Sequence, residues 1–391
     1  MGIPKVDAEG MLVRVLVSFL ATAGLFYVNI MPALVDGLKL TLNFTNQQAG
    51  LIGSANVYGA AFGAFCIVFF VQKINWRASS YLLLLSLIAI DFLSFLVSEA
   101  NILAAVRFIH GFVGGSLVGI GFALISKTPQ ADRTFGMLLL VQFGFGGLGM
   151  MYIPQLVESF GIMILYGSLV AFSLITLVML PFIPDFSNLK SRSFESSCWK
   201  LLTERTLILV LLSIFLFQAA NMGLYAFIVG LGKNSGLSIA FISTSLGWAA
   251  WIGIVGSLLV IWLSTRFGVS VPLLIGIGLT ALGTWALIFS ANPTIWIMAN
   301  LGVGITWAFV IPYLFAMCAQ LDSNGQVAAM GGLASKLGLA SGPVITGILL
   351  GEGQYNRVIL IAVVVLLISL ITSLFAANFL SHYEKKSVSQ S

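Results

Sequence analysis

Three side chains that can hold or transfer a proton lie close together in the sequence, inside two long apolar stretches. Asp91 falls in the stretch over residues 79–98, and Arg107 and His110 fall in the next one, over 101–126. Arg107 and His110 are three residues apart, so a helix places them on nearly the same face. Such a trio could form a structural ion pair, relay a proton or contact a charged solute directly. All three interpretations are open at this point.

A second candidate is a lysine without an acidic partner in its own apolar stretch. Lys336 lies about ten residues into the stretch over 326–350, which contains no Asp or Glu. A charge at the centre of a membrane helix costs roughly 2.5 to 3.5 kcal/mol, so it usually faces a cavity or a partner. Lys336 could bind the negative group of a ligand, pair with a distant carboxylate such as Asp91, or pack against backbone carbonyls. The first interpretation predicts an anionic or zwitterionic ligand.

The chain contains twelve apolar stretches of membrane-spanning length. Hydrophobic residues make up 59% of the sequence and charged residues only 8%, whereas soluble domains are about 25% charged. About 20 apolar residues cross a bilayer as a helix. We therefore predict an all-α polytopic membrane protein with twelve transmembrane helices. The predicted spans are 12–35, 48–71, 79–98, 101–126, 134–157, 161–183, 206–231, 238–264, 270–291, 293–319, 326–350 and 357–380.

Basic residues are distributed unequally between the two ends of these spans. With both termini on one side, that side holds thirteen of the eighteen basic residues, the opposite side holds three, and two lie inside spans. The positive-inside rule then makes both termini and the loop over 184–204 cytoplasmic, in a plasma (inner) membrane. The basic balance thus reflects topology and does not indicate a nucleic-acid partner. The thirteen are Lys5, Arg14, Lys73, Arg77, Lys127, Arg133, Lys190, Arg192, Lys200, Arg205, Arg266, Lys385 and Lys386.

The polar loop over 184–204 divides the chain into an N-terminal six-helix bundle, 1–183, and a C-terminal one, 205–391. Three glycine pairs recur at an offset of 194 residues, and at the same offset Gln142 falls on Lys336. We interpret this as a duplication into two pseudo-symmetric bundles, an architecture of transporters that bind solute near the membrane midplane. Gln142 would then lie opposite Lys336. The glycine pairs are Gly53 with Gly247, Gly59 with Gly253, and Gly144 with Gly338.

Motifs in both halves resemble those of the major facilitator superfamily. The fourth span reads Arg107-Phe-Ile-His110-Gly-Phe-Val-Gly-Gly, similar to the family's RxxQGxG with His in place of Gln. The loop after the second span keeps only Lys73 and Arg77 of a G-x-x-x-D-R-x-G-R-R motif, and the second half keeps Arg266 with the glycine two residues later. In that family this loop holds the inward gate closed, so here the gate must be held more weakly or in another way.

A third resemblance lies in the eleventh span. Gly338-x-x-x-Gly342-Pro343-x-x-x-Gly347 is similar to the glycine-proline motif that antiporters of the family carry in the fifth span. We therefore assign gating roles to Gly338, Gly342 and Pro343, together with the basic residues of the two loop motifs. Gly59-x-x-x-Gly63 predicts a close helix contact.

The resemblance implies a secondary active transporter that works by alternating access. From the charges we predict a small organic solute, anionic or zwitterionic, and proton coupling through Asp91, Arg107 and His110, as symport or antiport. The alternatives are a multidrug exporter of lipophilic compounds and a lipid or lysolipid flippase. We expect no enzyme activity, because no carboxylates cluster and no G-x-x-x-x-G-K-[ST] occurs. We also expect a monomer without cofactor or metal. Further predicted solute-binding residues are Asn29, Asn56, Asn221 and Tyr225.

Overall fold

The computed structural model describes residues 5–71, 73–186, 205–263, 266–321, 326–351 and 353–388, with side chains described up to residue 380. Within these ranges every regular element is a helix, as predicted. The chain falls into two compact units, Met1–Arg192 with Ile239–Gly247, and Ser193–Ser238 with Trp248–Ser391. Most of the predicted loop over 184–204 lies outside the described residues. The same holds for Lys190, Arg192 and Lys200 and for the side chains of Lys385 and Lys386.

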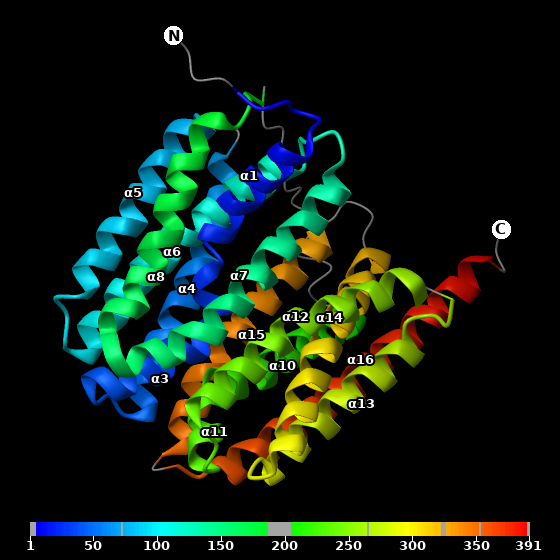
Figure 1. Ribbon diagram of the computed structural model, residues 1–391. Coiled ribbons are helices and arrows are strands. Elements are labelled where there is room, and N and C mark those ends of the chain that lie inside the picture. Colours follow the sequence, from blue (N-terminus) through cyan, green and yellow to red (C-terminus); the bar gives the residue numbers. More distant parts are fainter. Residues whose placement is uncertain are drawn as a thin grey trace. The chain divides into compact units, whose positions relative to one another are not determined.

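The helices follow the predicted spans closely (Figure 1). Those that begin before residue 190 are α1 Met11–Ala23, α2 Phe26–Asn29, α3 Met31–Leu42, α4 Asn46–Phe70, α5 Trp76–Ser94, α6 Ala100–Ile125, α7 Ala131–Phe160, α8 Ile162–Met179 and η1 Leu180–Phe182. The later ones are α10 Arg205–Ala226, α11 Ile228–Asn234, α12 Ile239–Leu263, α13 Ser270–Ala286, η2 Leu287–Phe289, α14 Pro293–Leu321, α15 Gln326–Leu350 and α16 Tyr355–Val388.

Eleven helices of the described residues are long and apolar enough to cross a membrane. The prediction of a single helix over 12–35 is wrong, because the first span is divided into α1, α2 and α3. Pro32 stands in the first turn of α3, where its missing N–H is tolerated, although the same residue would interrupt a continuous helix. The seventh predicted span is divided as well, between α10 and α11.

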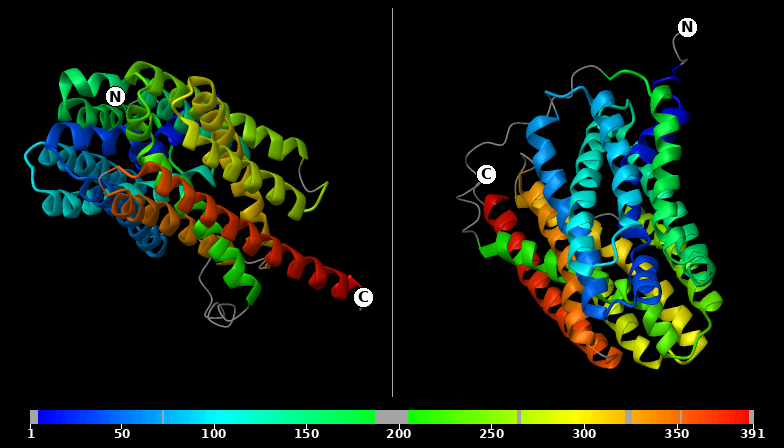
Figure 2. Two further views of the ribbon diagram at one scale, coloured as in Figure 1. Left: turned by 90° about the horizontal axis from the view of Figure 1, so that it is seen from below. Right: turned by 90° about the vertical axis from the view of Figure 1, so that its left-hand side faces the viewer.

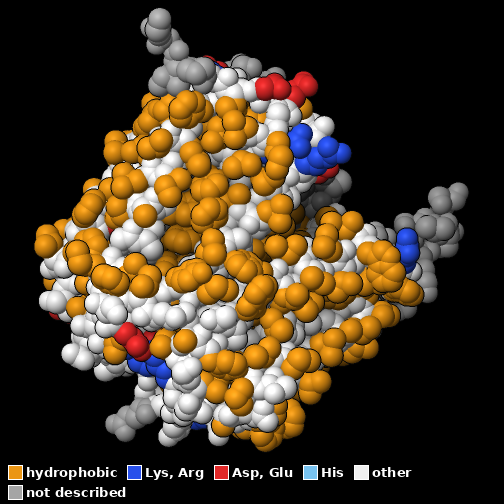
Figure 3. Space-filling view, viewed as in Figure 1, with side chains coloured by type: hydrophobic (Ala, Val, Ile, Leu, Met, Phe, Trp, Pro, Cys, Tyr) orange, Lys and Arg blue, Asp and Glu red, His pale blue; other side chains and the backbone are white. Residues whose placement is uncertain are grey.

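Hydrophobic side chains spread over the surface of the helices. Figure 3 shows them across most of the viewed face, while charged side chains gather near the helix ends. Leu82 of α5 and Met298 of α14 are two-thirds exposed. A surface of this kind suits contact with lipid tails and not with water.

Polar residues cap the helices where they leave the apolar layer. Thr45 and Gln48 form a capping box at the start of α4. Glu99 caps α6, and its carboxylate accepts hydrogen bonds from the backbone N–H groups of Ile102 and Asn101. These hydrogen bonds lower the pKa of Glu99 below its usual value. Each cap satisfies backbone groups that a helix end leaves free.

Glycines bring particular helices into backbone contact. In the first unit, Gly59 and Gly63 of α4, and Gly111 and Gly115 of α6, each face a backbone carbonyl of the other helix so closely that a Cβ would collide with it. α4 and α6 accordingly lie side by side (Figures 1 and 2). The close contact predicted from Gly59-x-x-x-Gly63 is confirmed.

The second unit uses the same device between α10 and α15. Gly338 and Gly342 of α15 face the backbone carbonyls of Phe215 and Ala219 on α10, again at a separation that leaves no space for a Cβ. Pro343 lies within α15, which continues unbroken to Leu350. The glycine-proline motif of the eleventh span thus packs α15 against α10.

Candidate functional site

Asp91 and Arg107, from the third and fourth spans, form an ion pair, which is one of the three interpretations of this trio. Arg107 Nη1 on α6 donates to Asp91 Oδ1 on α5 at 2.8 Å, and neither side chain has exposed surface. Arg107 Nη2 donates to the Ile90 carbonyl at 3.2 Å and to the Ser94 hydroxyl. Several acceptors therefore surround a guanidinium that is removed from solvent, as a buried charge requires.

His110 and Asn56 extend the pair into a cluster of four polar side chains. His110 Nε2 lies 3.3 Å from Asp91 Oδ1, and His110 Nδ1 lies 2.8 Å from Nδ2 of Asn56 on α4. Asn56 Nδ2 also donates to the Arg107 carbonyl at 3.2 Å. Because an amide nitrogen only donates, His110 Nδ1 accepts, and Nε2 carries the hydrogen that points to Asp91. His110 therefore links the carboxylate to the amide.

Three atoms of this neighbourhood are buried without a hydrogen-bond partner among the described residues. They are Asp91 Oδ2, Arg107 Nε and the hydroxyl of Tyr166 on α8, whose ring centroid lies 4.6 Å from the Arg107 guanidinium carbon. An unsatisfied buried polar atom costs about 1–3 kcal/mol. Asp91 Oδ2 is consequently the atom to which a proton can be added without breaking a hydrogen bond.

Asn29 and Gln142, both predicted to bind solute, are hydrogen-bonded to each other in the first unit. Gln142 Nε2 on α7 donates to Asn29 Oδ1 on α2 at 3.1 Å, and Asn29 Nδ2 donates to the Gln142 carbonyl at 3.2 Å. Both side chains are half-buried. Gln142 and Lys336 belong to different units, so their predicted opposition stays a prediction.

In the second unit, polar side chains from three helices join on one face of α10. Gln218 Nε2 donates to the Ser335 hydroxyl on α15 at 2.7 Å, and Gln218 Oε1 accepts from Trp307 Nε1 on α14 at 2.7 Å. The Trp307 ring packs edge-on against Tyr225, with centroids 5.8 Å apart. Gln218, Tyr225 and Trp307 thus form a connected polar and aromatic surface.

Asn221 lies on the same face of α10 and is incompletely bonded. Its Nδ2 donates to the carbonyl of Phe217 at 2.8 Å, one turn earlier. Its Oδ1 is buried and has no hydrogen-bond partner among the described residues. The side chain as a whole is 5% exposed.

Lys336 follows Ser335 on α15 and is half-buried. Its ammonium group makes no hydrogen bond or ion pair with the part of the chain that the structure describes. The sequence explains this, because the helices from α10 to α15, and α16 up to residue 380, contain no Asp or Glu. A cation in these spans therefore has no carboxylate on a spanning helix of its own half to pair with.

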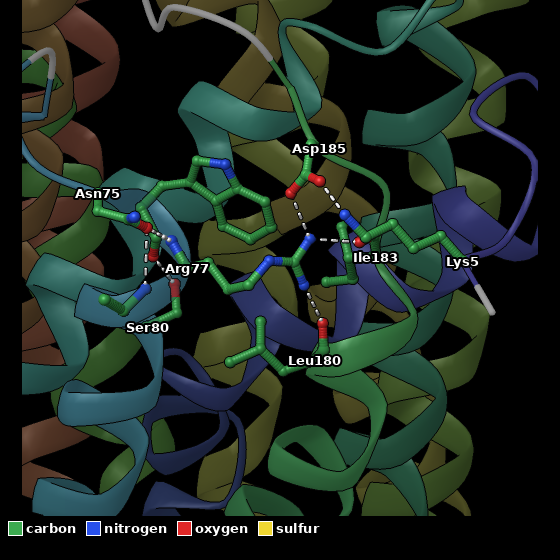
Figure 4. Close-up of polar contacts among 9 residues, drawn as sticks. Lys5, Asn75, Arg77, Ser80, Leu180, Ile183 and Asp185 are labelled. Atoms are coloured by element: carbon green, nitrogen blue, oxygen red, sulfur yellow. Dashed lines mark hydrogen bonds and ion pairs between the residues drawn. The ribbon is translucent and has the colours of Figure 1, made fainter. Parts of the chain in front are cut away.

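Arg77 of the loop motif binds the end of α8 (Figure 4). It donates to the carbonyl of Leu180 at 2.8 Å and to that of Ile183 at 2.5 Å, and forms an ion pair with Asp185 at 3.0 Å. Lys5 binds the same carboxylate. Asp185 thus supplies the acid that the loop motif lacks, from another part of the first unit.

The remaining predicted gating cations have no comparable contacts. Lys73 and Arg266 are exposed, and neither forms an ion pair with a described residue. Gly268, two residues after Arg266, has φ +65°, a left-handed conformation that suits glycine in a tight turn. The gating roles of Lys73 and Arg266 therefore stay predictions.

Ser94, Asp185, Tyr166 and Ser335 are residues of these clusters that were not predicted. Ser94 lies three residues after Asp91 on the same helix face, so helical spacing could have revealed it. Asp185 lies on the predicted cytoplasmic side, as Arg77 does, so the predicted topology could have suggested that the two residues pair. Tyr166 and Ser335 reach their partners only through helix packing. No sequence pattern announces such contacts.

The described residues contain no group of three or more His, Cys, Asp or Glu side chains that could hold a metal ion. What they contain instead is a buried charged cluster in one unit and a polar and aromatic face with a lysine in the other. Set within eleven membrane-length apolar helices, these features define a polytopic membrane transport protein.

The comparisons specify the family. The sequence profile of the Major Facilitator Superfamily matches residues 15–335, so the chain belongs to this superfamily of transporters. No curated protein sequence matches. Two crystal structures of the nucleoside transporter NupG, one of a variant, are similar with a TM-score of 0.77. The variant is 15% identical to this chain, and the match covers 95% of this chain and 100% of the NupG chain. The other structure is 14% identical, with 95% and 99% covered.

A third structure is a bacterial homologue of the human lysosomal transporter Spinster, in an inward-facing and unoccupied conformation. Its TM-score is 0.73 at 13% identity, with 94% of this chain and 96% of the other covered. At such low identity these likenesses establish the fold alone.

Proposed function

We propose that the protein is a secondary active transporter that moves a small organic anion or zwitterion across the plasma (inner) membrane by alternating access, with proton coupling. The observation that carries the proposal is the ammonium group of Lys336, which forms no hydrogen bond or ion pair with a described residue. A buried or half-buried cation is costly unless it meets a negative partner or water. Since the helical spans of its half contain no carboxylate, an anionic group on the solute would supply the negative partner.

The cluster around Asp91 supports proton coupling. Asp91 Oδ1 is held by Arg107 and His110, whereas Oδ2 has no hydrogen-bond partner among the described residues. A proton could therefore occupy Oδ2 while the ion pair persists, and His110 offers a second titratable site beside it. Loading and release of that proton would accompany the change between conformations.

Thermal unfolding of the detergent-purified protein tests the solute class. The panel contains organic anions, zwitterions, lipophilic cations and, because NupG is a nucleoside transporter, uridine. A ligand that binds only the folded state at 100 times its Kd stabilises it by about 2.7 kcal/mol. We expect stabilisation by anions or zwitterions that disappears in Lys336→Ala and persists in Lys127→Ala, whose cation lies in the loop after α6.

The alternative, an exporter of lipophilic compounds, is favoured by the aromatic pair of Tyr225 and Trp307. Such compounds would bind the rings by apolar contact and would not need the ammonium group. Equal stabilisation of the original protein and of Lys336→Ala by lipophilic cations would establish this alternative and reject the anion proposal.

Transport in proteoliposomes tests the coupling. With the solute found by thermal unfolding, we expect an imposed pH gradient to drive accumulation in the original protein and in Asp132→Asn, an exposed carboxylate at the start of α7. Asp91→Asn should bind the solute but lose the response to the gradient. An unchanged response in Asp91→Asn would reject proton coupling through this cluster.

A further inference from the structure

The polar face of α10 contains one buried acceptor to which no described residue donates a hydrogen bond. Gln218, Asn221 and Tyr225 are spaced by three and four residues, so they lie along one side of the helix. Gln218 is satisfied by Ser335 and Trp307, and Tyr225 packs on the same Trp307 ring. Asn221 lies between them, and of the three side chains it alone has a buried polar atom, Oδ1, without a hydrogen-bond partner in the described parts of the chain.

A comparison within the second unit shows what is unusual about Asn221. Asn300 on α14 is also buried and also donates from Nδ2 to the carbonyl one turn earlier, at 2.9 Å to Trp296. The corresponding bond of Asn221, to Phe217, is 2.8 Å long. Of these two asparagines, Asn221 alone has a side-chain oxygen that is buried without a hydrogen-bond partner among the described residues. A buried carbonyl without a hydrogen bond is costly, and a ligand with a hydrogen-bond donor would recover that cost.

Lys336 lies on the same side of the contact between α10 and α15. The two helices run in parallel, because Gly338 lies against Phe215 and Gly342, four residues later, against Ala219. Ser335 meets Gln218 at one side of this contact. The next residue, Lys336, is turned by about a further 100° around α15 in the same direction, so it points away from α10 but stays on that side of the contact.

The same register sets the separation of Lys336 and Asn221 along the helix axis. Gly338 lies against the stretch from Phe215 to Ala219, so Lys336, two residues earlier, lies near the level of Phe215. Asn221 is six residues further along α10, which corresponds to about 9 Å of helix rise. The indole of Trp307 contacts residues on both sides of Asn221.

We propose that this transporter recognises an anion, or zwitterion, that carries a separate O–H or N–H donor several bonds away, which Asn221 Oδ1 accepts while Lys336 binds the anionic group. The inference rests on the proposed function and narrows its substrate class. A flat apolar segment between the two polar ends would lie on Trp307. A simple carboxylate without a donor would leave Asn221 unsatisfied and would bind more weakly.

Matched pairs of probes test this inference by thermal unfolding. Para-hydroxyphenylpropionate and phenylpropionate differ only in a terminal O–H, and tyrosine and phenylalanine form the zwitterionic pair. We expect the hydroxylated member of at least one pair to bind about tenfold more tightly than its partner. This preference should vanish in Asn221→Leu and persist in Asn300→Leu, while Lys336→Ala should lose both members.

The outcomes separate the two proposals. Equal binding of both members, or a preference that survives in Asn221→Leu, would overturn the inference, whereas loss of binding in Lys336→Ala would still support an anionic solute. Binding that is unaffected by Lys336→Ala would overturn the proposed function itself. The ligand-free proteins give an independent reading, because Asn221→Leu should be at least as stable as Asn300→Leu. A lower stability would show that Asn221 has a structural partner and would also overturn the inference.

Discussion

At the scale of single residues, Asp91 is bonded asymmetrically. Arg107 and His110 both contact Oδ1. The second guanidinium nitrogen, Nη2, donates to the Ser94 hydroxyl and to the Ile90 carbonyl. A structural ion pair between Asp91 and Arg107 needs only these contacts, which form the first half of the cluster. Asp91 Oδ2, Arg107 Nε and the Tyr166 hydroxyl form a second half, which makes no hydrogen bond to any residue that the structure describes. A network that is only partly satisfied contributes little to stability, which is consistent with the proposed proton-coupling role of this cluster.

The Tyr166 hydroxyl gives a direct test of this distinction. In Tyr166→Phe the ring keeps its place beside the Arg107 guanidinium and its edge-on contact with Phe95, while an unsatisfied buried O–H is removed. We expect the apparent free energy of unfolding in mixed micelles to stay the same or rise by about 1 kcal/mol. A loss of more than about 1 kcal/mol would mean that the hydroxyl is bonded through water and would contradict the view of an unused donor.

At the scale of elements, glycine spacing determines which helices touch. Gly59 of α4 leaves no space for a Cβ beside α6, so we expect Gly59→Ala to separate the two helices and to yield little monodisperse protein on size-exclusion chromatography. Gly278 of α13 is the matched control, because nothing lies within 4 Å of its Cβ position. Gly278→Ala should instead stabilise by about 0.5–1 kcal/mol through helix propensity. Equal yields of Gly59→Ala and Gly278→Ala would contradict the close contact.

Arg77 joins the start of α5 to the end of α8 with a planar fork that serves two carbonyls and a carboxylate. Lysine cannot reproduce this geometry. We expect Arg77→Lys to raise the mobility of a spin label attached at Phe186→Cys, next to Asp185. Lys73→Ala is the control, since Lys73 is exposed in the loop that precedes α5. Equal label mobility with and without Arg77→Lys would show that these contacts do not hold the segment.

At the scale of the whole molecule, the same pairs of spans meet in both halves. The first and fifth spans contact through α1 and α7, as the seventh and eleventh do through α10 and α15. The second and fourth contact through α4 and α6, as the eighth and tenth do where Gly256 of α12 faces the Ile305 carbonyl of α14. The first span of each half is also divided. These correspondences are what the proposed duplication requires.

Span positions were predictable because apolar length alone determines whether a helix can cross a bilayer. The Asp91–Arg107 pair was predictable because two charges at similar depth on consecutive spans have few other partners. The pairing of Asn29 with Gln142 was not, since it joins residues 113 positions apart through tertiary packing. Nor was the division of the first span, because the stretch from Met11 to Leu42 stays predominantly apolar across both breaks.

The distribution of basic residues makes the last prediction, that the two termini and the loop after α6 are cytoplasmic. Two exposed positions report on opposite sides, Ser126 in that loop and Leu96 between α5 and α6. In a protein whose three native cysteines are replaced by alanine, a membrane-impermeant maleimide should label Leu96→Cys in intact cells and Ser126→Cys only in inside-out vesicles. Thirteen basic residues against three favour this orientation, because loops rich in Lys and Arg stay on the cytoplasmic side. The reverse labelling pattern would mean that the charge bias does not set the topology, and it would place Arg77 and Asp185 on the outer face, where they could not act at a cytoplasmic gate.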